Sequence, residues 1–215
     1  MTTDWTTVSA LATGFGTLVL AVATFASVRS ANRAARVAQE ALSVGIRPLL
    51  INSRLNDPAQ KIFFQEGKYT QLDGGRGAAE VVDDVVYLAI SIRNAGRGIA
   101  VLHGWRFMVG RDLNPQRPDP DDFRHQNRDI LIAPDDIGFW QGAFRDSSDP
   151  QYEEAVAAVN KNEVLTIDLL YGDYEGGQRV ISRMMVQRSP NDTAGRGAWL
   201  ASVVRHWNVD RPDPR

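Results

Sequence analysis

The sequence contains no cysteine, and histidine is scarce, with 3 residues in a chain of 215. The missing cysteine excludes disulfide bonds, cysteine-ligated zinc, iron–sulfur clusters and a thiol nucleophile. His103, His125 and His206 lie far apart in the chain, which leaves little material for a histidine metal centre. The sequence therefore predicts no cofactor and no metal.

An excess of basic residues is also missing. The chain has 24 basic and 26 acidic residues, a formal net charge of −2 and a pI of about 5.9. Binding to nucleic acid depends largely on contacts between phosphates and a basic surface. We therefore expect no nucleic-acid partner.

The third absence is local, because no charged residue occurs between Asp4 and Arg29. An apolar helix of about 20 residues is long enough to cross the hydrocarbon layer of a membrane. A cleaved signal peptide would carry basic residues before its apolar run, and a soluble core helix seldom runs this far without charge. The pattern favours a transmembrane helix over about residues 6–28, with the lipid bilayer as its partner.

The flanks of this segment indicate its orientation. Arg29, Arg33 and Arg36 follow the apolar run, and basic flanks remain on the cytoplasmic side. Trp5 stands where an interfacial aromatic anchor is expected. These four residues predict a single-pass protein of the cell membrane, with its N-terminus outside and its C-terminal domain in the cytoplasm.

Small side chains recur along the predicted span. Ser9, Thr13, Thr17 and Ala21 are spaced four apart, so they share one face of a helix. Such a face lets two helices approach closely, which suggests self-association or packing into a larger complex. The alternative is that small residues simply fill an ordinary anchor.

Residues 29–45 are rich in alanine and arginine and contain no proline, so the helix is expected to continue as a juxtamembrane stem. Gly45 and Pro48 mark its end. The chain thus divides into residues 1–45, the span and its stem, and residues 46–215, a soluble domain.

The soluble domain has the alternating pattern of β-strands. The clearest hairpin joins residues 164–171 to residues 180–187 through the loop Tyr174–Gly177. In a further run, Val101, His103, Trp105, Phe107 and Val109 are predicted to share one face. The other expected strands cover residues 47–55, 61–64, 86–93 and 138–144. This pattern predicts a mainly β fold, an antiparallel β-sandwich or open barrel with one or two short helices.

Two short helices are expected in this domain. One begins at Asp149 and Pro150. The other covers about residues 197–208, because Trp199, Val203 and Trp207 are spaced four apart. Its tryptophan face either packs on the edge of the sandwich or contacts a membrane or a partner.

No complete catalytic motif is present. Gly96-Arg97-Gly98 lacks the third glycine and the following helix of a dinucleotide loop, so a turn is expected there. Asp168, Asp173 and Glu175 near the hairpin are an acid–base candidate, although carboxylates at such places usually form turns. The sequence favours a non-enzyme.

An apolar span, an arginine- and alanine-rich stem and Arg47-Pro48-Leu49 at the entry to a β domain resemble a group of uncharacterised actinobacterial single-pass membrane proteins. The runs Asn94–Ala100, Tyr171–Asp173, Arg205–Asn208 and Asp213–Arg215 are similar to the same group. The resemblance implies the fold and assigns no catalytic residues.

Three functional hypotheses remain open at this stage. The favoured one is a membrane-anchored cytosolic domain that binds a protein partner or acts as a scaffold. The second is an enzyme that acts on a small or lipid-derived substrate at the membrane face. The third is an accessory subunit of a larger membrane complex.

Overall fold

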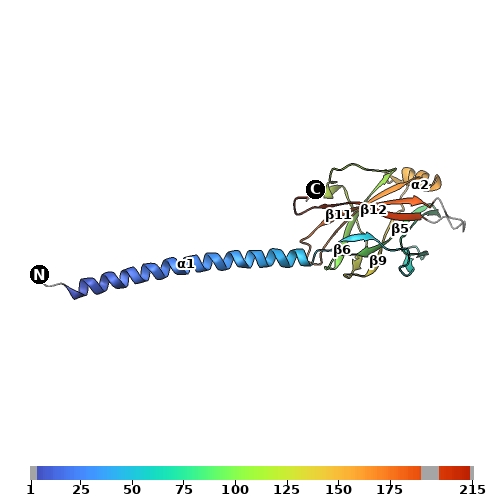
Figure 1. Ribbon diagram of the computed structural model, residues 1–215. Coiled ribbons are helices and arrows are strands. Elements are labelled where there is room, and N and C mark those ends of the chain that lie inside the picture. The colour runs from blue at the N-terminus through green and yellow to red at the C-terminus, as the bar shows by residue number, and fades with distance from the viewer. Residues whose placement is uncertain (1–3, 190–198, 214–215) are drawn as a thin grey trace. The chain divides into compact units, whose positions relative to one another are not determined.

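The computed structural model describes residues 4–189 and 199–213 of the chain. These residues form two separate units, divided between Gly45 and Ile46. The first unit holds one long helix and the second holds a mainly β domain (Figure 1).

Helix α1 (Trp5–Gly45) runs without interruption, as expected for a segment without proline. Its stretch Val8–Gln39 is long enough and apolar enough to cross a membrane. The large apolar side chains of this stretch, among them Phe15, Leu18 and Phe25, are mostly exposed. The predicted span and its helical continuation are therefore both present.

The β domain is built from twelve strands among its described residues, together with two short helical segments. The helical segments are η1 (Pro120–Asp122) and α2 (Tyr152–Asn160). The strands are β1 (Leu50–Asn52), β2 (Gln60–Phe63), β3 (Tyr69–Leu72), β4 (Arg76–Val82), β5 (Val85–Asn94), β6 (Ala100–Val109), β7 (Arg124–His125), β8 (Leu131–Ile132), β9 (Ile137–Phe144), β10 (Leu165–Gly172), β11 (Val180–Arg188) and β12 (Trp199–Asn208).

Ten of these strands form one antiparallel sheet in the order β1-β5-β4-β12-β11-β10-β6-β7, with β9 paired to β5 and β8 paired to β6. Strands β4 and β12 share only two register pairs, Trp199 with Gly77 and Leu200 with Arg76. This short junction lets the sheet fold over, so that two halves face each other around one core. The predicted mainly β, sandwich-like fold is confirmed.

Aromatic contacts between the two halves show how the sheet closes. Trp105 of β6 meets Trp140 of β9 edge-on at 5.3 Å between ring centroids, and Phe107 meets Phe144 at 5.2 Å. Strands β6 and β9 are not paired by backbone hydrogen bonds in this sheet. Side chains therefore join these two strands, and edge-to-face rings suit such a contact.

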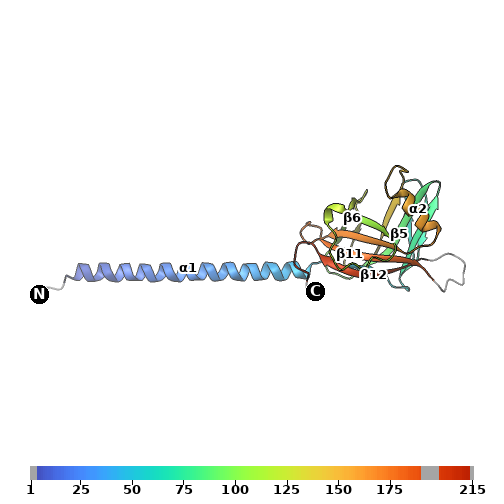
Figure 2. The same ribbon diagram turned by 90° about the horizontal axis from the view of Figure 1, so that it is seen from above.

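Two segments cover the outer faces of the sheet. The hairpin β2–β3 packs Ile62, Phe64 and Leu72 against Tyr87 and Ala89 of β5. On the opposite half, Phe123 packs with Leu170, Ile181 and Trp207 on the outer face of strands β10–β12. Figure 2 shows β11 and β12 side by side, and α2 packs against β4 and β5.

The predicted C-terminal helix over about residues 197–208 is wrong, because residues 199–208 form strand β12, paired along its length with β11. Residues 197 and 198 lie outside the described part of the chain. A spacing of four fits a helix, but it also keeps side chains on one face of a strand. Pairing with the free edge of β11 decided between these two conformations.

A β-bulge in β12 places Trp199 and Trp207 on different faces of the strand, so the predicted tryptophan face does not form. The β11–β12 register shifts between Arg183 and Met184, which pair with Arg205 and Val203 and leave Val204 as an extra residue. Trp199 consequently packs in the main core, whereas Trp207 packs in the outer cluster. The two tryptophans do not share a face.

The predicted shared face of β6 is also wrong, because this strand contains a second bulge. The register with β10 shifts after Gly104, so that Leu102 instead of His103 pairs with Tyr171. Ala100 and Leu102 are buried before this point, and Trp105 and Phe107 after it. Val101 and His103 therefore do not lie on the same face as the two aromatic residues.

Candidate functional site

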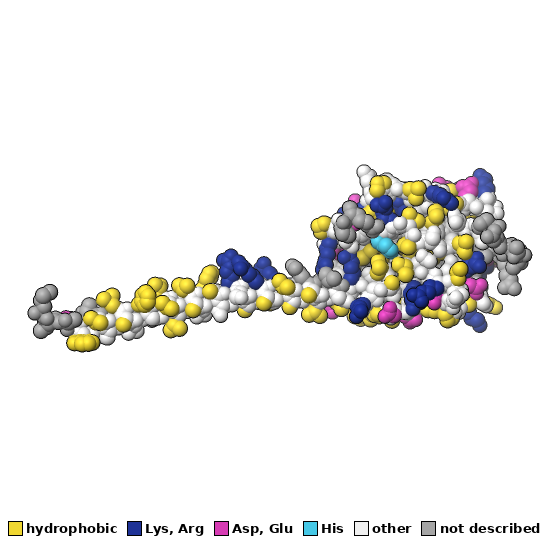
Figure 3. Space-filling model, viewed as in Figure 1, with side chains coloured by type: hydrophobic (Ala, Val, Ile, Leu, Met, Phe, Trp, Pro, Cys, Tyr) yellow, Lys and Arg dark blue, Asp and Glu magenta, His cyan; other side chains and the backbone are white. Residues whose placement is uncertain are grey.

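The predicted membrane-anchor residues lie on helix α1. Trp5 is exposed near its start. Arg29, Arg33 and Arg36 line a shallow groove on the helix surface together with Phe25 and Val28. Figure 3 shows basic side chains gathered on one side of the helix, after a long stretch of hydrophobic ones.

The small-residue face of the span has its hydroxyl groups satisfied within the helix. Thr13 Oγ1 donates to the carbonyl of Ser9 at 2.9 Å, and Thr17 Oγ1 donates to the carbonyl of Thr13 at 2.9 Å. Such back-bonding is the usual state of hydroxyl residues within a helix. The face formed by Ser9, Thr13, Thr17 and Ala21 therefore offers close packing rather than free donors, and its role in association stays a prediction.

The C-terminal residues predicted as a partner surface lie mostly inside the domain. Trp199 is 2% exposed and donates through Nε1 to the carbonyl of Ala79. Trp207 is 3% exposed and donates to the carbonyl of Pro115. Val203 is partly buried against the core. These three side chains hold β12 in place and do not present one exposed contact face.

The motif Asn94–Gly98 contacts residues 46–49, the first segment of the β domain, and holds it in place. Asn94 Oδ1 accepts from the backbone N–H of Leu49 at 3.1 Å, and the N–H of Ala95 donates to the carbonyl of Leu49. A Cβ at Gly96 would lie 2.2 Å from the carbonyl oxygen of Arg47, and one at Gly98 would lie 1.7 Å from that of Ile46. These glycines are needed because another stretch of backbone runs directly against them. The expected turn therefore also fixes the first segment of the domain. We call the contacts that hold residues 46–50 in place the clasp.

A chain of hydroxyl groups holds the same segment from the other side. The phenol oxygen of Tyr171 accepts from the N–H of Leu50 at 3.0 Å and lies 2.8 Å from Ser182 Oγ. Ser182 Oγ lies 2.7 Å from Nδ1 of His206. Burial raises the pKa of Tyr171 to about 12, so the phenol stays protonated.

The Ser182–His206 pair has the spacing of a nucleophile and its base, but its surroundings differ from those of a hydrolase site. Ser182 is fully buried, and its hydroxyl also contacts Tyr171 and the carbonyl of Leu50. A nucleophile must be reachable by its substrate. We therefore describe this pair as part of the structural clasp. No motif in the sequence pointed to it, because its two residues come from different strands.

The acidic candidates near the hairpin have separate structural roles. Asp168 is fully buried and forms hydrogen bonds of 2.7 and 2.9 Å with Arg183. Asp173 accepts from the N–H of Gly177 and shapes the hairpin loop. Glu175 is exposed in that loop. The described residues contain no cluster of three or more acids and histidines that could hold a metal ion.

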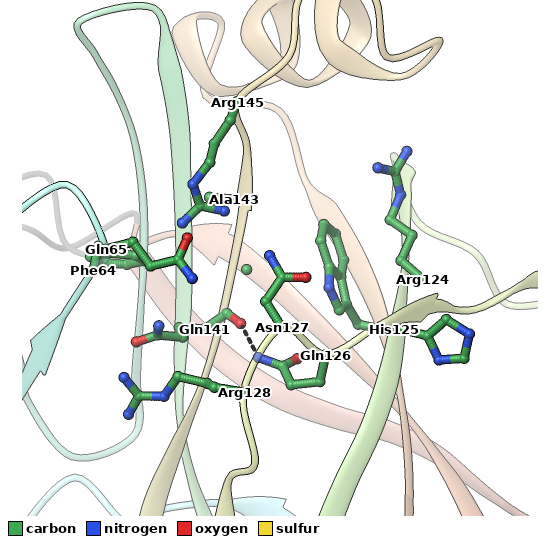
Figure 4. Close-up of a pocket in the computed structure, with 12 residues that line it drawn as sticks. Phe64, Gln65, Arg124, His125, Gln126, Asn127, Arg128, Gln141, Ala143 and Arg145 are labelled. Atoms are coloured by element: carbon green, nitrogen blue, oxygen red, sulfur yellow. Dashed lines mark hydrogen bonds between the residues drawn. The ribbon is translucent and has the colours of Figure 1, made fainter.

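The pocket that we consider the candidate site lies on the outer face of β9. It has a volume of about 160 Å³ and is walled by the turn at Phe64 and Gln65 on one side and by the segment Arg124–Arg128 on the other (Figure 4). Trp105 also lines it. Its polar lining consists of arginines, one histidine and amides, namely Arg124, Arg128, Arg145, His125, Gln65, Gln126, Asn127 and Gln141.

Two of the three arginines are fixed by carboxylates outside the pocket. Arg124 forms a two-pronged contact with Asp149, also donates to Gln151 Oε1 at 2.9 Å, and stacks over Phe144 at 4.7 Å. The hydrogen bond from Arg124 holds the pKa of Asp149 below its usual range. In the same way, the hydrogen bond from Arg145 lowers the pKa of Glu66.

The amide oxygen of Gln141 is buried without a partner. This side chain is 6% exposed, and its Oε1 forms no hydrogen bond within the described structure. The neighbouring Gln126 donates through Nε2 to the backbone carbonyl of Gln141 at 3.0 Å, while its own Oε1 is also unpartnered (Figure 4). A buried amide oxygen without a donor costs free energy unless a ligand or water supplies one.

Sequence reasoning did not find this pocket. Its residues come from four separate stretches of the chain, around residues 64, 105, 124 and 141. The one available signal was His125 within the basic run Arg124–Arg128. The chain matches no known family model, no curated protein and no solved structure.

Proposed function

We propose that this chain is a membrane-tethered binding module. Helix α1 anchors it with the N-terminus outside, and the β domain binds its ligand or partner in the cytoplasm. The observation that carries the proposal is the long apolar helix, whose side chains are exposed, joined to a domain that has its own core. An exposed apolar surface of this size is unfavourable in water and favourable in a bilayer.

The chemistry of the β domain supports binding more than catalysis. Its buried carboxylate Asp168 is matched by arginine, and its buried serine Ser182 is enclosed. Its pocket is lined by arginine, histidine and amide side chains. These groups recognise ligands by hydrogen bonds and charge, whereas an acid–base mechanism needs a pair of titratable groups that a substrate can reach.

The absence of cysteine allows a direct test of topology. Single cysteines introduced as Thr3→Cys and Lys161→Cys are labelled with a membrane-impermeant thiol reagent in right-side-out vesicles. We expect labelling of the Thr3→Cys variant in sealed vesicles, and of the Lys161→Cys variant only after detergent is added. The parent chain is the unlabelled control. Labelling of Lys161→Cys in sealed vesicles would overturn the proposed orientation.

A second experiment tests the binding role. The tagged full-length chain is extracted from its native membrane in mild detergent, and co-purifying proteins are identified by mass spectrometry. A stoichiometric partner would identify the chain as an adaptor or a subunit. If the chain is purified without a partner and without a bound small molecule, the proposed binding role is wrong.

A further inference from the structure

We propose that the pocket on the outer face of β9 binds a small organic anion that carries hydroxyl groups, such as a three-carbon phosphate or hydroxycarboxylate. This inference rests on the proposed binding function and names the ligand class. Four features of the pocket lead to it: its charge, its free donor groups, its unpartnered acceptors and its size.

The charge of the pocket is positive. The Arg124 and Arg145 charges are matched by Asp149 and Glu66, but Arg128 forms no ion pair within the described residues. Its guanidinium lies 5.8 Å from the ring centroid of Phe139 on β9, which keeps it along the pocket wall. The lining contains no aspartate or glutamate. An anion therefore meets one uncompensated positive charge here and no opposing carboxylate.

Donor groups remain free after the structural hydrogen bonds are made. Arg145 donates to Glu66 through Nε, and its two terminal nitrogens form no hydrogen bond within the described residues. In Figure 4 its guanidinium group points toward the side of the pocket where Gln65 and Gln141 lie. Two terminal N–H groups in one plane match the geometry of a carboxylate or phosphate edge.

The unpartnered acceptors indicate that the ligand also supplies donors. Gln126 Oε1 and Gln141 Oε1 both lack a hydrogen-bond partner and both belong to residues that line the pocket. An ionised carboxylate alone has no proton to give them. A hydroxyl group next to the anionic group does. Both amide oxygens are covered by surrounding atoms, so the ligand hydroxyl pairs with one of them when that glutamine side chain turns toward the pocket.

The volume limits the ligand to a small molecule. About 160 Å³ holds roughly five water molecules at about 30 Å³ each, and it is well below the range typical of drug-sized ligands. A three-carbon phosphate or hydroxycarboxylate fits this space, whereas a nucleotide does not.

The test is isothermal titration calorimetry on the full-length chain in nanodiscs of uncharged lipid. The probes are glycerol 3-phosphate, glycerate and inorganic phosphate, with glycerol as the uncharged control. The variants are Arg128→Gln, which removes the unpaired charge at an exposed position, and Gln141→Glu, which replaces the buried amide by a carboxylate of the same shape. Arg97→Gln is the matched control, because it makes the same charge change at an exposed site outside the pocket.

We expect saturable binding of glycerol 3-phosphate or glycerate, with inorganic phosphate weaker and glycerol inactive. Loss of one charged hydrogen bond in Arg128→Gln should weaken binding by about tenfold or more. Gln141→Glu should weaken it at least as much by repulsion, and Arg97→Gln should leave it unchanged.

Two results would overturn the inference. One is that no anion binds in a saturable manner. The other is that an anion binds equally well to the parent chain and to Arg128→Gln, which would place it elsewhere. Because membrane topology is measured separately by thiol labelling, failure of this inference leaves the tethering proposal standing, and the reverse also holds.

Discussion

Asp168 is fully buried in the β domain, and two arginines balance its charge. Arg183 reaches both carboxylate oxygens, and Arg106 Nη2 lies 2.9 Å from Oδ2. Arg183 is itself almost completely buried and also contacts the carboxylate of Asp112. A buried pair of this kind contributes little net stability, but breaking it leaves an isolated charge that is very costly to bury.

We therefore expect Asp168→Asn to lower the free energy of unfolding by about 3 kcal/mol or more. Urea denaturation of residues 46–215, followed by tryptophan fluorescence, measures the change. Asp73→Asn, at an exposed position, is the control. A loss below about 1 kcal/mol would mean that water reaches this pair.

The clasp glycines give a prediction about sterics. A Cβ at Gly98 would lie 1.7 Å from the backbone oxygen of Ile46, so Gly98→Ala must displace the opening segment of the domain. Gly177→Ala is the matched control, because its nearest atom lies 3.9 Å away. We expect Gly98→Ala to destabilise the domain strongly and to expose residues 46–50 to hydrogen exchange, with Gly177→Ala close to the parent. Normal protection of Leu50 in Gly98→Ala would contradict the described contact.

The Arg124–Asp149 pair gives a prediction about pH. The hydrogen bond from Arg124 lowers the pKa of Asp149 in the folded state from its usual value of 3.8. A depressed carboxyl pKa stabilises the fold above the unfolded pKa, so this contribution is complete above about pH 5 and disappears as the pH falls below 3.8. Asp149→Asn should cost about 1–3 kcal/mol at pH 7 and flatten the loss of stability between pH 5 and 3. If the free energy of unfolding fell in parallel with pH for the variant and the parent, ionisation of Asp149 would not contribute to the pH dependence of stability.

At the scale of elements, β12 behaves as a core strand. Trp199 fills the main core, and its Nε1 bonds to the carbonyl of Ala79. Trp199→Ala should destabilise the domain by about 3–5 kcal/mol, because a large buried side chain leaves a cavity. Tyr174→Ala, which removes an aromatic ring that is 73% exposed, should change stability little. If the Trp199→Ala domain were as stable as the parent but no longer bound a partner, Trp199 would belong to a contact surface and not to the core.

The elements that sequence reasoning predicted correctly are those with strong local patterns. The uncharged run after Asp4 predicted α1, and strict alternation predicted β5 and the hairpin of β10 and β11. The predicted C-terminal helix was wrong because residues 199–208 pair with β11, and the predicted shared faces were wrong because of bulges in β6 and β12. A bulge depends on the partner strand, so the alternation within a single strand does not reveal where its inward face changes.

The candidate pocket was beyond prediction for a related reason. Its wall from Arg124 to Arg128 lies beside β9 only because β6 and β9 close the sheet through aromatic contacts. Gln141 alternates with core residues of β9 and looks like any outward polar residue in the sequence. Only the folded domain shows that the Gln141 side-chain oxygen lacks a hydrogen-bond donor.

At the scale of the whole molecule, the chain consists of two units with different surfaces. Helix α1 exposes apolar side chains over the length of a membrane span, whereas residues 46–215 bury their own core and hold their own first segment in the clasp. We therefore expect the domain to fold without the helix. The central claim of the proposed function is that the helix alone provides the membrane attachment.

The most direct test compares the full-length chain with residues 46–215 after expression in the same cells. Membranes are washed with alkaline carbonate, and each fraction is probed for the β domain. We predict that the full chain stays in the membrane pellet and that residues 46–215 are soluble, folded and monodisperse. Release of the full chain by carbonate, or retention of residues 46–215 in the pellet, would contradict the claim that α1 is a membrane anchor for an independent binding domain.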